Sequence, residues 1–165
     1  MPYDPRFIAN VFLTLGDRHD ILPMRLQKLV FLAHGWHLAS KSDTARPLVE
    51  GRIEARDGGP AHVILAAHEK SYSRDRDGLI EIVPGGNNAV SLSGDLNPNE
   101  RDIIERVWQR YGHYTTVELT EMLQAEGTPW SNAYFGKGRN ARIKDEDIEA
   151  YFLRLGLAGR ISEPA

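Results

Sequence analysis

The chain contains no cysteine among its 165 residues, and this absence removes several classes of protein at once. Disulfide-stapled folds and thiolate metal centres are excluded, because both need cysteine sulfur. A cysteine nucleophile is excluded for the same reason. Lack of cysteine is also compatible with a reducing compartment, so we expect a cytoplasmic protein.

Two further absences concern membranes and nucleic acids. The sequence has no apolar run of about 18 residues, so it predicts no membrane-spanning helix. Its N-terminus, MPYDPRFIAN, lacks a basic segment followed by an apolar stretch, and we expect no signal peptide. The formal net charge is −3, whereas proteins that wrap duplex DNA are usually basic. We therefore expect no nucleic-acid partner for the isolated protein.

What the chain does contain is the composition of one globular domain. Hydrophobic residues make up 41% of it, which is enough for a single core at this length. No repeat, linker or low-complexity tract divides it, so we predict one domain over residues 3–157 and a C-terminal tail over 158–165. The predicted fold class is mainly α (α+β), a compact helical domain with a small inserted antiparallel β-hairpin or sheet.

The first two predicted helices both start at a proline. Asp4 precedes Pro5, which is an N-cap followed by proline at the first helical position, and Gly16 supplies a stop. Pro23 starts the next helix, which we predict at about 23–40.

The later helices are marked by their caps. Asn97 to Glu100 and Thr115 to Glu118 are capping boxes, and each opens a helix. Asp145 caps a last helix, which we expect to end at Gly156. The intervening segment TPWSNAYFGKGRN is predicted to be a loop or a broken helix.

The middle of the chain has a different pattern. Residues 49–55 alternate loosely and predict a strand, and Pro60 is predicted to open a helix through 61–72. Residues 79–83 and 89–93 alternate with period two around PGGNN, which predicts an antiparallel hairpin at one edge of the domain.

The predicted second helix raises the main question. Its sequence, LPMRLQKLVFLAHGWH, is apolar almost all the way round and should be buried, yet it includes Gln27, Lys28, His34 and His37. These side chains are open to four interpretations: a catalytic site, a metal site, a partner-binding face or a hydrogen-bonded core.

Catalytic and metal motifs are missing around these residues. His34 and His37 share a helix face, but the HExxH spacing is absent and the helix has no carboxylate. The serines lack the G-x-S-x-G turn, and the glycine-rich stretches match neither a Walker A loop nor a dinucleotide fingerprint. We expect no catalytic site, metal or cofactor, and rank a hydrolase or metal enzyme third among the candidate functions.

A DNA-binding regulator is the second candidate. Residues 100–125 have the outline of a helix-turn-helix. Their second helix, TTVELTEMLQAEG, carries three glutamates and no Lys or Arg, whereas a recognition helix needs side chains that contact bases and phosphates. A packed helical hairpin is the interpretation that we favour.

The second helix resembles the signature of the Panacea domain, the SocA-like antitoxin family. That signature reads proline, Met, Lys or Arg, Leu-Gln-Lys-Leu and then Ala-His-Gly. The residues that carry the match are Pro23, Met24, Leu26, Gln27, Lys28, Leu29, Ala33, His34, Gly35 and Trp36.

Later segments extend this resemblance over about residues 5–153. Ile53-Glu54-Ala55 with Gly59-Pro60 looks like the family's Ile-Glu-Ala-x-x-x-Gly-Pro element. The C-terminal half of the family is matched by Val107-Trp108, Tyr111-Gly112, Leu119, Pro129-Trp130, Ile148 and Tyr151-Phe152. The chain departs at Arg56, where the family often has an aromatic residue, and at Leu123-Gln124, where Thr-His is common.

The resemblance implies a non-enzymatic antitoxin that neutralises a cognate protein toxin, usually encoded beside it, by direct contact. A solitary phage or mobile-element protein that binds a host factor is the alternative within the same interpretation. The oligomeric state is left open. The candidate partner-binding residues are Lys28, Gly35, Trp36, Glu54, Gly59, Pro60 and Trp130.

The remaining motif residues are interpreted as structural supports: Pro23, Met24, Leu26, Gln27, Leu29 and His34. Gln27 and His34 should be hydrogen-bonded, because an unpaired buried polar group costs roughly 1–3 kcal/mol. Lys28 should hold its ammonium in solvent or against a carboxylate, with Glu54 the candidate. Gly35 should let another backbone approach closely.

Overall fold

The computed structural model describes residues 2–15, 23–40, 47–67 and 96–162. In these ranges the chain forms seven helices and a three-stranded antiparallel sheet, so the predicted mainly helical α+β fold is confirmed. The predicted hairpin at 79–93 lies outside the described residues. Within the described ranges no helix is both long and apolar enough to cross a bilayer.

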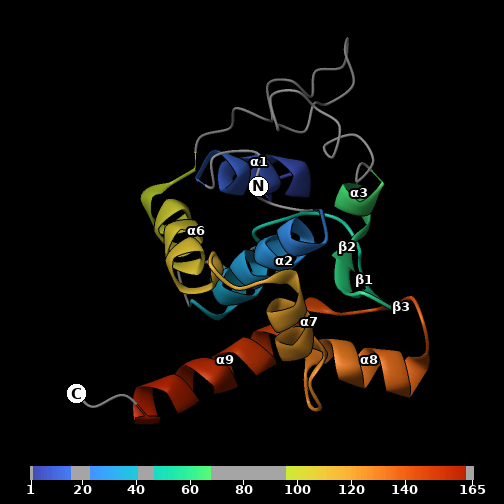
Figure 1. Ribbon diagram of the computed structural model, residues 1–165. Coiled ribbons are helices and arrows are strands. Elements are labelled where there is room, and N and C mark those ends of the chain that lie inside the picture. Colours follow the sequence, from blue (N-terminus) through green and yellow to red (C-terminus); the bar gives the residue numbers. More distant parts are fainter. Residues whose placement is uncertain (1, 16–22, 41–46, 68–95, 163–165) are drawn as a thin grey trace.

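Helix α2 (Pro23–Ala39) runs through the middle of the fold, and the other elements surround it (Figure 1). Helix α1 (Pro5–Leu15) lies above it in Figure 1 and α6 (Pro98–Tyr111) to its left. Helix α9 (Asp145–Ser162) packs along it, and the sheet and α7 (Thr116–Gln124) cover the rest. The all-round apolar sequence of α2 therefore corresponds to a helix that is covered on all sides from Leu26 to Gly35.

The core is built around α2. Every residue from Leu26 to Gly35 is buried, the polar ones included. Phe31 of α2 packs against Phe152 of α9 with ring centroids 6.1 Å apart, and Phe12 of α1 is also fully buried. Three segments that are far apart in the sequence thus share one hydrophobic core.

The predicted capping boxes define the starts of α6 and α7. The Asn97 side chain accepts from the Glu100 N–H at 2.8 Å, and the Asn97 N–H donates back to the Glu100 carboxylate at 2.9 Å. Thr115 and Glu118 form the same reciprocal pair. Both predicted helix starts are confirmed.

Helices α6 and α7 do not form the predicted packed hairpin. They share few direct contacts, because α6 packs on α2 and α1 whereas α7 packs on α2, the sheet and α8 (Pro129–Lys137). Glu118 and Glu121 of α7 are exposed, so the second helix of the supposed helix-turn-helix presents negative charge to solvent. Repulsion from phosphates disfavours that helix as a reader of DNA.

The end of the chain differs from the prediction at two places. TPWSNAYFGKGRN forms helix α8, which starts where the Thr128 hydroxyl accepts from the Ser131 N–H at 3.2 Å. Helix α9 does not end at Gly156 but continues to Ser162. Gly156 therefore lies inside the helix beside the Trp36 ring, and a Cβ there would make an ordinary contact with that ring at 3.4 Å.

The sheet has the strand order β2-β1-β3. Strand β1 (Ile53–Arg56) pairs antiparallel with β2 (Gly59–His62) through a tight turn at Asp57 and Gly58. Its other edge pairs with β3 (Ala141–Arg142), which connects α8 to α9.

The prediction that Pro60 opens a helix is wrong. Pro60 lies in β2, the edge strand, where the missing proline N–H breaks no ladder bond that the sheet needs. Helix α3 (Val63–Ala66) begins only after β2 has ended. The predicted strand at 49–55 is likewise displaced, because regular pairing starts at Ile53.

Candidate partner-binding surface

Gln27 joins α2 to the end of the sheet. Its Nε2 donates to the His62 carbonyl at 3.2 Å, and its Oε1 accepts from the His62 N–H at 2.9 Å. Both groups are buried, so the amide satisfies two backbone groups that would otherwise have no water to bond. Gln27 is hydrogen-bonded as predicted, and its role as a structural support stays a prediction.

His34 joins α2 to two other parts of the fold. Its Nδ1 accepts from the Val49 N–H at 3.4 Å, and its Nε2 lies 2.9 Å from the Asp145 carboxylate at the start of α9. The first contact needs an unprotonated Nδ1, so the Nε2–H tautomer donates to Asp145. His34 is therefore hydrogen-bonded as predicted. Among the described residues no three His, Asp or Glu side chains are grouped to hold a metal ion.

Lys28 does not lie at the surface. Its side chain is 1% exposed, and its Nζ is 3.5 Å from the Met24 carbonyl oxygen. The amine end lies beneath β2, since a Cβ on Gly59 would be 3.4 Å from the Lys28 Cε. Gly59 has a φ of +123°, which disfavours any side chain there. Of the two predicted placements of the ammonium, in solvent or against a carboxylate, the first is wrong, because the sheet covers this turn of α2.

Glu54 is not the partner of Lys28. Its carboxylate pairs with Arg52 at 2.8 Å and with Arg56 at 3.2 Å, both on its own strand or next to it. Arg52 is about half exposed, so this is a surface cluster of low energetic weight.

The turn between β1 and β2 is held by side chains from α7 and α8. The indole N–H of Trp130 donates to the Arg56 carbonyl at 2.6 Å. Gln124 donates to the Asp57 carbonyl at 2.8 Å, and the Tyr134 hydroxyl donates to the Asp57 carboxylate at 2.8 Å. Trp130 is only 6% exposed, so it fixes the turn from inside.

Gly35 allows a close approach, but of a side chain and not of a backbone. A Cβ at this position would collide with the ring of Phe152, and Gly35 itself is buried.

Five of the seven candidate partner-binding residues thus lie in the interior: Lys28, Gly35, Gly59, Pro60 and Trp130. Trp36 and Glu54 remain partly accessible.

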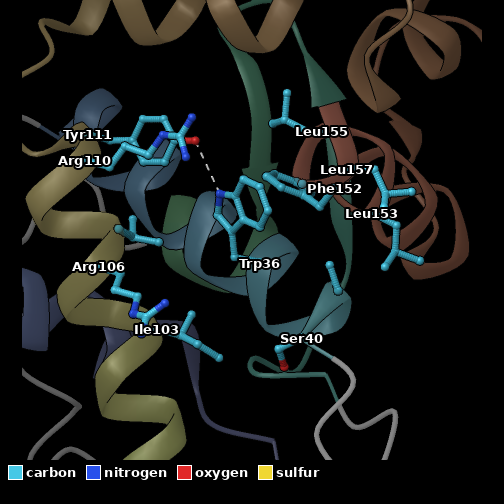
Figure 2. Close-up of a pocket in the computed structure, with 13 residues that line it drawn as sticks. Trp36, Ser40, Ile103, Arg106, Arg110, Tyr111, Phe152, Leu153, Leu155 and Leu157 are labelled. Atoms are coloured by element: carbon cyan, nitrogen blue, oxygen red, sulfur yellow. Dashed lines mark hydrogen bonds between the residues drawn. The ribbon is translucent and has the colours of Figure 1, made fainter. Parts of the chain in front are cut away.

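Trp36 lines a groove of about 570 Å³ between the C-terminal end of α2, helix α6 and helix α9 (Figure 2). We call it the Trp36 groove and define it by Trp36, Arg106, Val107, Arg110, Phe152 and Leu155. The Trp36 ring packs edge-on against Phe152, with centroids 5.1 Å apart. Its indole N–H donates to the Tyr111 hydroxyl at 3.4 Å, which is a long hydrogen bond.

The charged side chains that line the Trp36 groove are both arginines of α6. Arg106 pairs with Asp102 at 3.0 Å on the exposed surface of the same helix. Arg110 lies over the Tyr111 ring at 5.6 Å, and in the described part of the chain no carboxylate pairs with it. Burial raises the pKa of Tyr111, so its hydroxyl stays protonated at neutral pH.

Trp36 can be recognised from the sequence motif, whereas the two arginines cannot. Arg106 and Arg110 are four apart on a helix, so they share a face beside Val107. That spacing alone is common on solvated helices. Only the packing of α9 against α2 turns this face into one wall of a groove.

Comparison with known proteins agrees with the resemblance. Residues 26–131 match the family model described as "Antitoxin SocA-like, Panacea domain". Antitoxin SocA of Caulobacter vibrioides (strain NA1000 / CB15N) is 33% identical over 159 residues, which cover 90% of this chain and 82% of that antitoxin. No solved structure matches the chain significantly.

These matches define the class of the protein as an antitoxin of a toxin–antitoxin system, which is not an enzyme. The chain belongs to the SocA-like, Panacea-domain antitoxin family.

Proposed function

We propose that the chain neutralises one cognate toxin, encoded by an adjacent gene, by binding that toxin directly in the cytoplasm. The observation that carries the proposal is its similarity to an antitoxin over 90% of its length. Membership of an antitoxin family implies a toxin partner.

The chemistry of α2 supports binding over catalysis. Gln27 and His34 use their polar atoms in hydrogen bonds that hold the fold together. An antitoxin requires affinity and specificity for one partner and no reactive group.

The test is co-expression with the protein encoded by the neighbouring gene. That protein alone should arrest growth, and the present chain should restore growth and elute with it as a complex. As a control, Leu29→Asp places a charge at a fully buried core position, so this variant should neither fold nor rescue. Failure of the folded wild-type chain both to rescue growth and to form the complex would overturn the proposal.

A further inference from the structure

We propose that the Trp36 groove receives a segment of the toxin that carries a large apolar side chain next to carboxylates. This inference rests on the proposed function, because it assumes that the toxin is bound directly. It names the surface and the chemistry of the recognised segment.

The apolar part of the Trp36 groove has the size and composition of a side-chain pocket. Its volume of about 570 Å³ falls within the range of pockets that bury small organic ligands. Trp36, Ile103 and Leu155 line it with partly exposed side chains over the buried Phe152, and Leu157 beside them is 57% exposed. Tryptophan at the centre of a partly desolvated hollow is the residue most often found to dominate a protein interface.

The positive charge of the Trp36 groove favours a bound segment in which acidic residues flank the apolar side chain. The chain carries a net charge of −3, yet Arg106 and Arg110 are the charged side chains that line this groove. The pair between Arg106 and Asp102 is exposed on both sides and therefore weak, so Arg106 can turn to a better-placed carboxylate. Carboxylates beside the apolar anchor of the toxin would meet both guanidinium groups.

Trp36 and Tyr111 add polar contacts at the same place. Their mutual hydrogen bond is long at 3.4 Å, and the Tyr111 hydroxyl hydrogen has no acceptor among the described residues. The indole N–H of Trp36, which is partly exposed, can donate instead to a backbone carbonyl of the bound segment, whereas Tyr111 is only 3% exposed. A directional donor in the groove favours a polypeptide over a purely apolar ligand.

The arrangement does not suit a nucleic acid. Both arginines lie on α6, whereas the α9 wall consists of Phe152, Leu153, Leu155, Gly156 and Leu157. A nucleic-acid backbone needs a continuous track of cationic contacts. One cationic wall facing one apolar wall matches an amphipathic protein segment instead.

The first test reverses the charges. Arg106→Glu, Arg110→Glu and the double variant are compared with Arg101→Glu, an exposed arginine of α6 outside the groove. Affinity for the purified product of the neighbouring gene is measured by calorimetry at low and high salt. We expect about a tenfold loss for each single variant, about a hundredfold loss for the double variant and less than a twofold change for Arg101→Glu. Wild-type affinity should fall with salt, and that of the double variant should not.

The second test fills the Trp36 groove. Gly156→Leu places a side chain against the Trp36 ring from within a helix, whereas Gly136→Leu makes the same change where a Cβ meets nothing within 4 Å. Thermal melting monitored by circular dichroism identifies the folded variants. We expect Gly156→Leu to remain folded and to lose at least about tenfold in affinity, while Gly136→Leu binds like wild type.

The outcomes separate the two proposals. If wild type binds and rescues growth but the double variant and Gly156→Leu both bind within twofold of wild type, the groove proposal is overturned and the proposed function stands. If wild type neither binds nor rescues, both fail. If sedimentation shows self-association that the double variant abolishes while toxin binding persists, the groove is a self-interface, which also overturns the proposal.

Discussion

Helix α2 contacts its surroundings differently along its length. At Gln27, Lys28 and His34 it is covered by the sheet and by the start of α9, and its polar atoms bond to neighbouring groups. At Trp36 the same helix borders a groove, where a long hydrogen bond and unpaired hydrogen-bonding capacity remain. The difference teaches that polar residues within an apolar helix can serve the fold, while we propose that the aromatic residue near its end serves binding.

Substitution of Lys28 should have the largest effect and separates the two regions most clearly. Lys28→Glu buries a carboxylate close to the Met24 carbonyl oxygen, so we expect a loss of about 3–5 kcal/mol in the free energy of unfolding. Lys144→Glu, at an exposed position, should change it by less than about 0.5 kcal/mol. Urea titration measures both. If Lys28→Glu unfolds like wild type but binds the toxin poorly, Lys28 belongs to the binding surface and not to the structural core.

Removal of the Gln27 amide should come next. Gln27→Leu leaves both the N–H and the carbonyl of His62 buried without their partner, at an expected cost of about 3 kcal/mol. Gln109→Leu, on the exposed surface of α6, is the matched control and should be nearly neutral. An unfolding free energy for Gln27→Leu within about 0.5 kcal/mol of wild type would contradict the structural role.

Two helix glycines provide a smaller contrast. Gly35→Ala forces the Phe152 ring to move, which costs about 3 kcal/mol in a packed core, and better helix propensity returns about 1 kcal/mol. The expected net loss is about 2 kcal/mol. Gly156→Ala has room beside Trp36 and should gain up to about 1 kcal/mol. Equal melting temperatures for the two variants would show that Gly35 is not a close-packing position.

Acidic pH should lower the free energy of unfolding through His62, the β2 residue that is bonded to Gln27 of α2. Burial lowers the pKa of His62 well below its usual value of 6.5, and nearby His34 lowers it further. The unfolded chain therefore takes up a proton that the folded chain resists, so this contribution to stability is complete above about pH 6.5 and declines below it. His62→Leu should flatten the decline. Its ring nitrogens have no hydrogen-bond partner among the described residues, so the substitution breaks no known bond there. A parallel pH profile for wild type and His62→Leu would refute this assignment.

The smallest effect on stability should come from the Trp36 groove itself. Arg110→Glu changes an exposed side chain without an ion pair in the described part of the chain, so unfolding free energy should shift by less than about 0.5 kcal/mol. Binding to the toxin should nevertheless weaken, because the variant places a negative charge in the Trp36 groove. Lys28→Glu is expected to lower the unfolding free energy and Arg110→Glu to lower the affinity for the toxin. The pair therefore tests whether stability and recognition depend on different parts of the molecule.

Local signals predicted much of the fold. The boxes at Asn97 and Thr115 and the proline at the start of α2 are determined by neighbouring residues, and the structure has all three. The helix predicted at Pro60 is wrong, because the place of Pro60 in an edge strand depends on pairing with β1. Local helix and strand propensities do not include the effect of that pairing.

The candidate site was less accessible to sequence reasoning. The motif indicated the family and drew attention to Lys28 and Gly35, but their burial results from β2 and Phe152, which lie elsewhere in the sequence. Arg106 and Arg110 carry no local mark of function. Their proximity to Trp36 follows only from the way in which α6 and α9 pack against α2.

The position of α9 also affects how the protein is made. Ribosomes extend a chain from its N-terminus at about 5–20 residues per second, so α2 emerges well before Phe152 and Leu155 are synthesised. Contacts between segments so distant in sequence form late and slow the folding of the domain. Until α9 has left the ribosome, the nascent chain has the Trp36 side chain but not the second wall of the groove, so the proposed binding of the toxin in this groove must await the synthesis of α9.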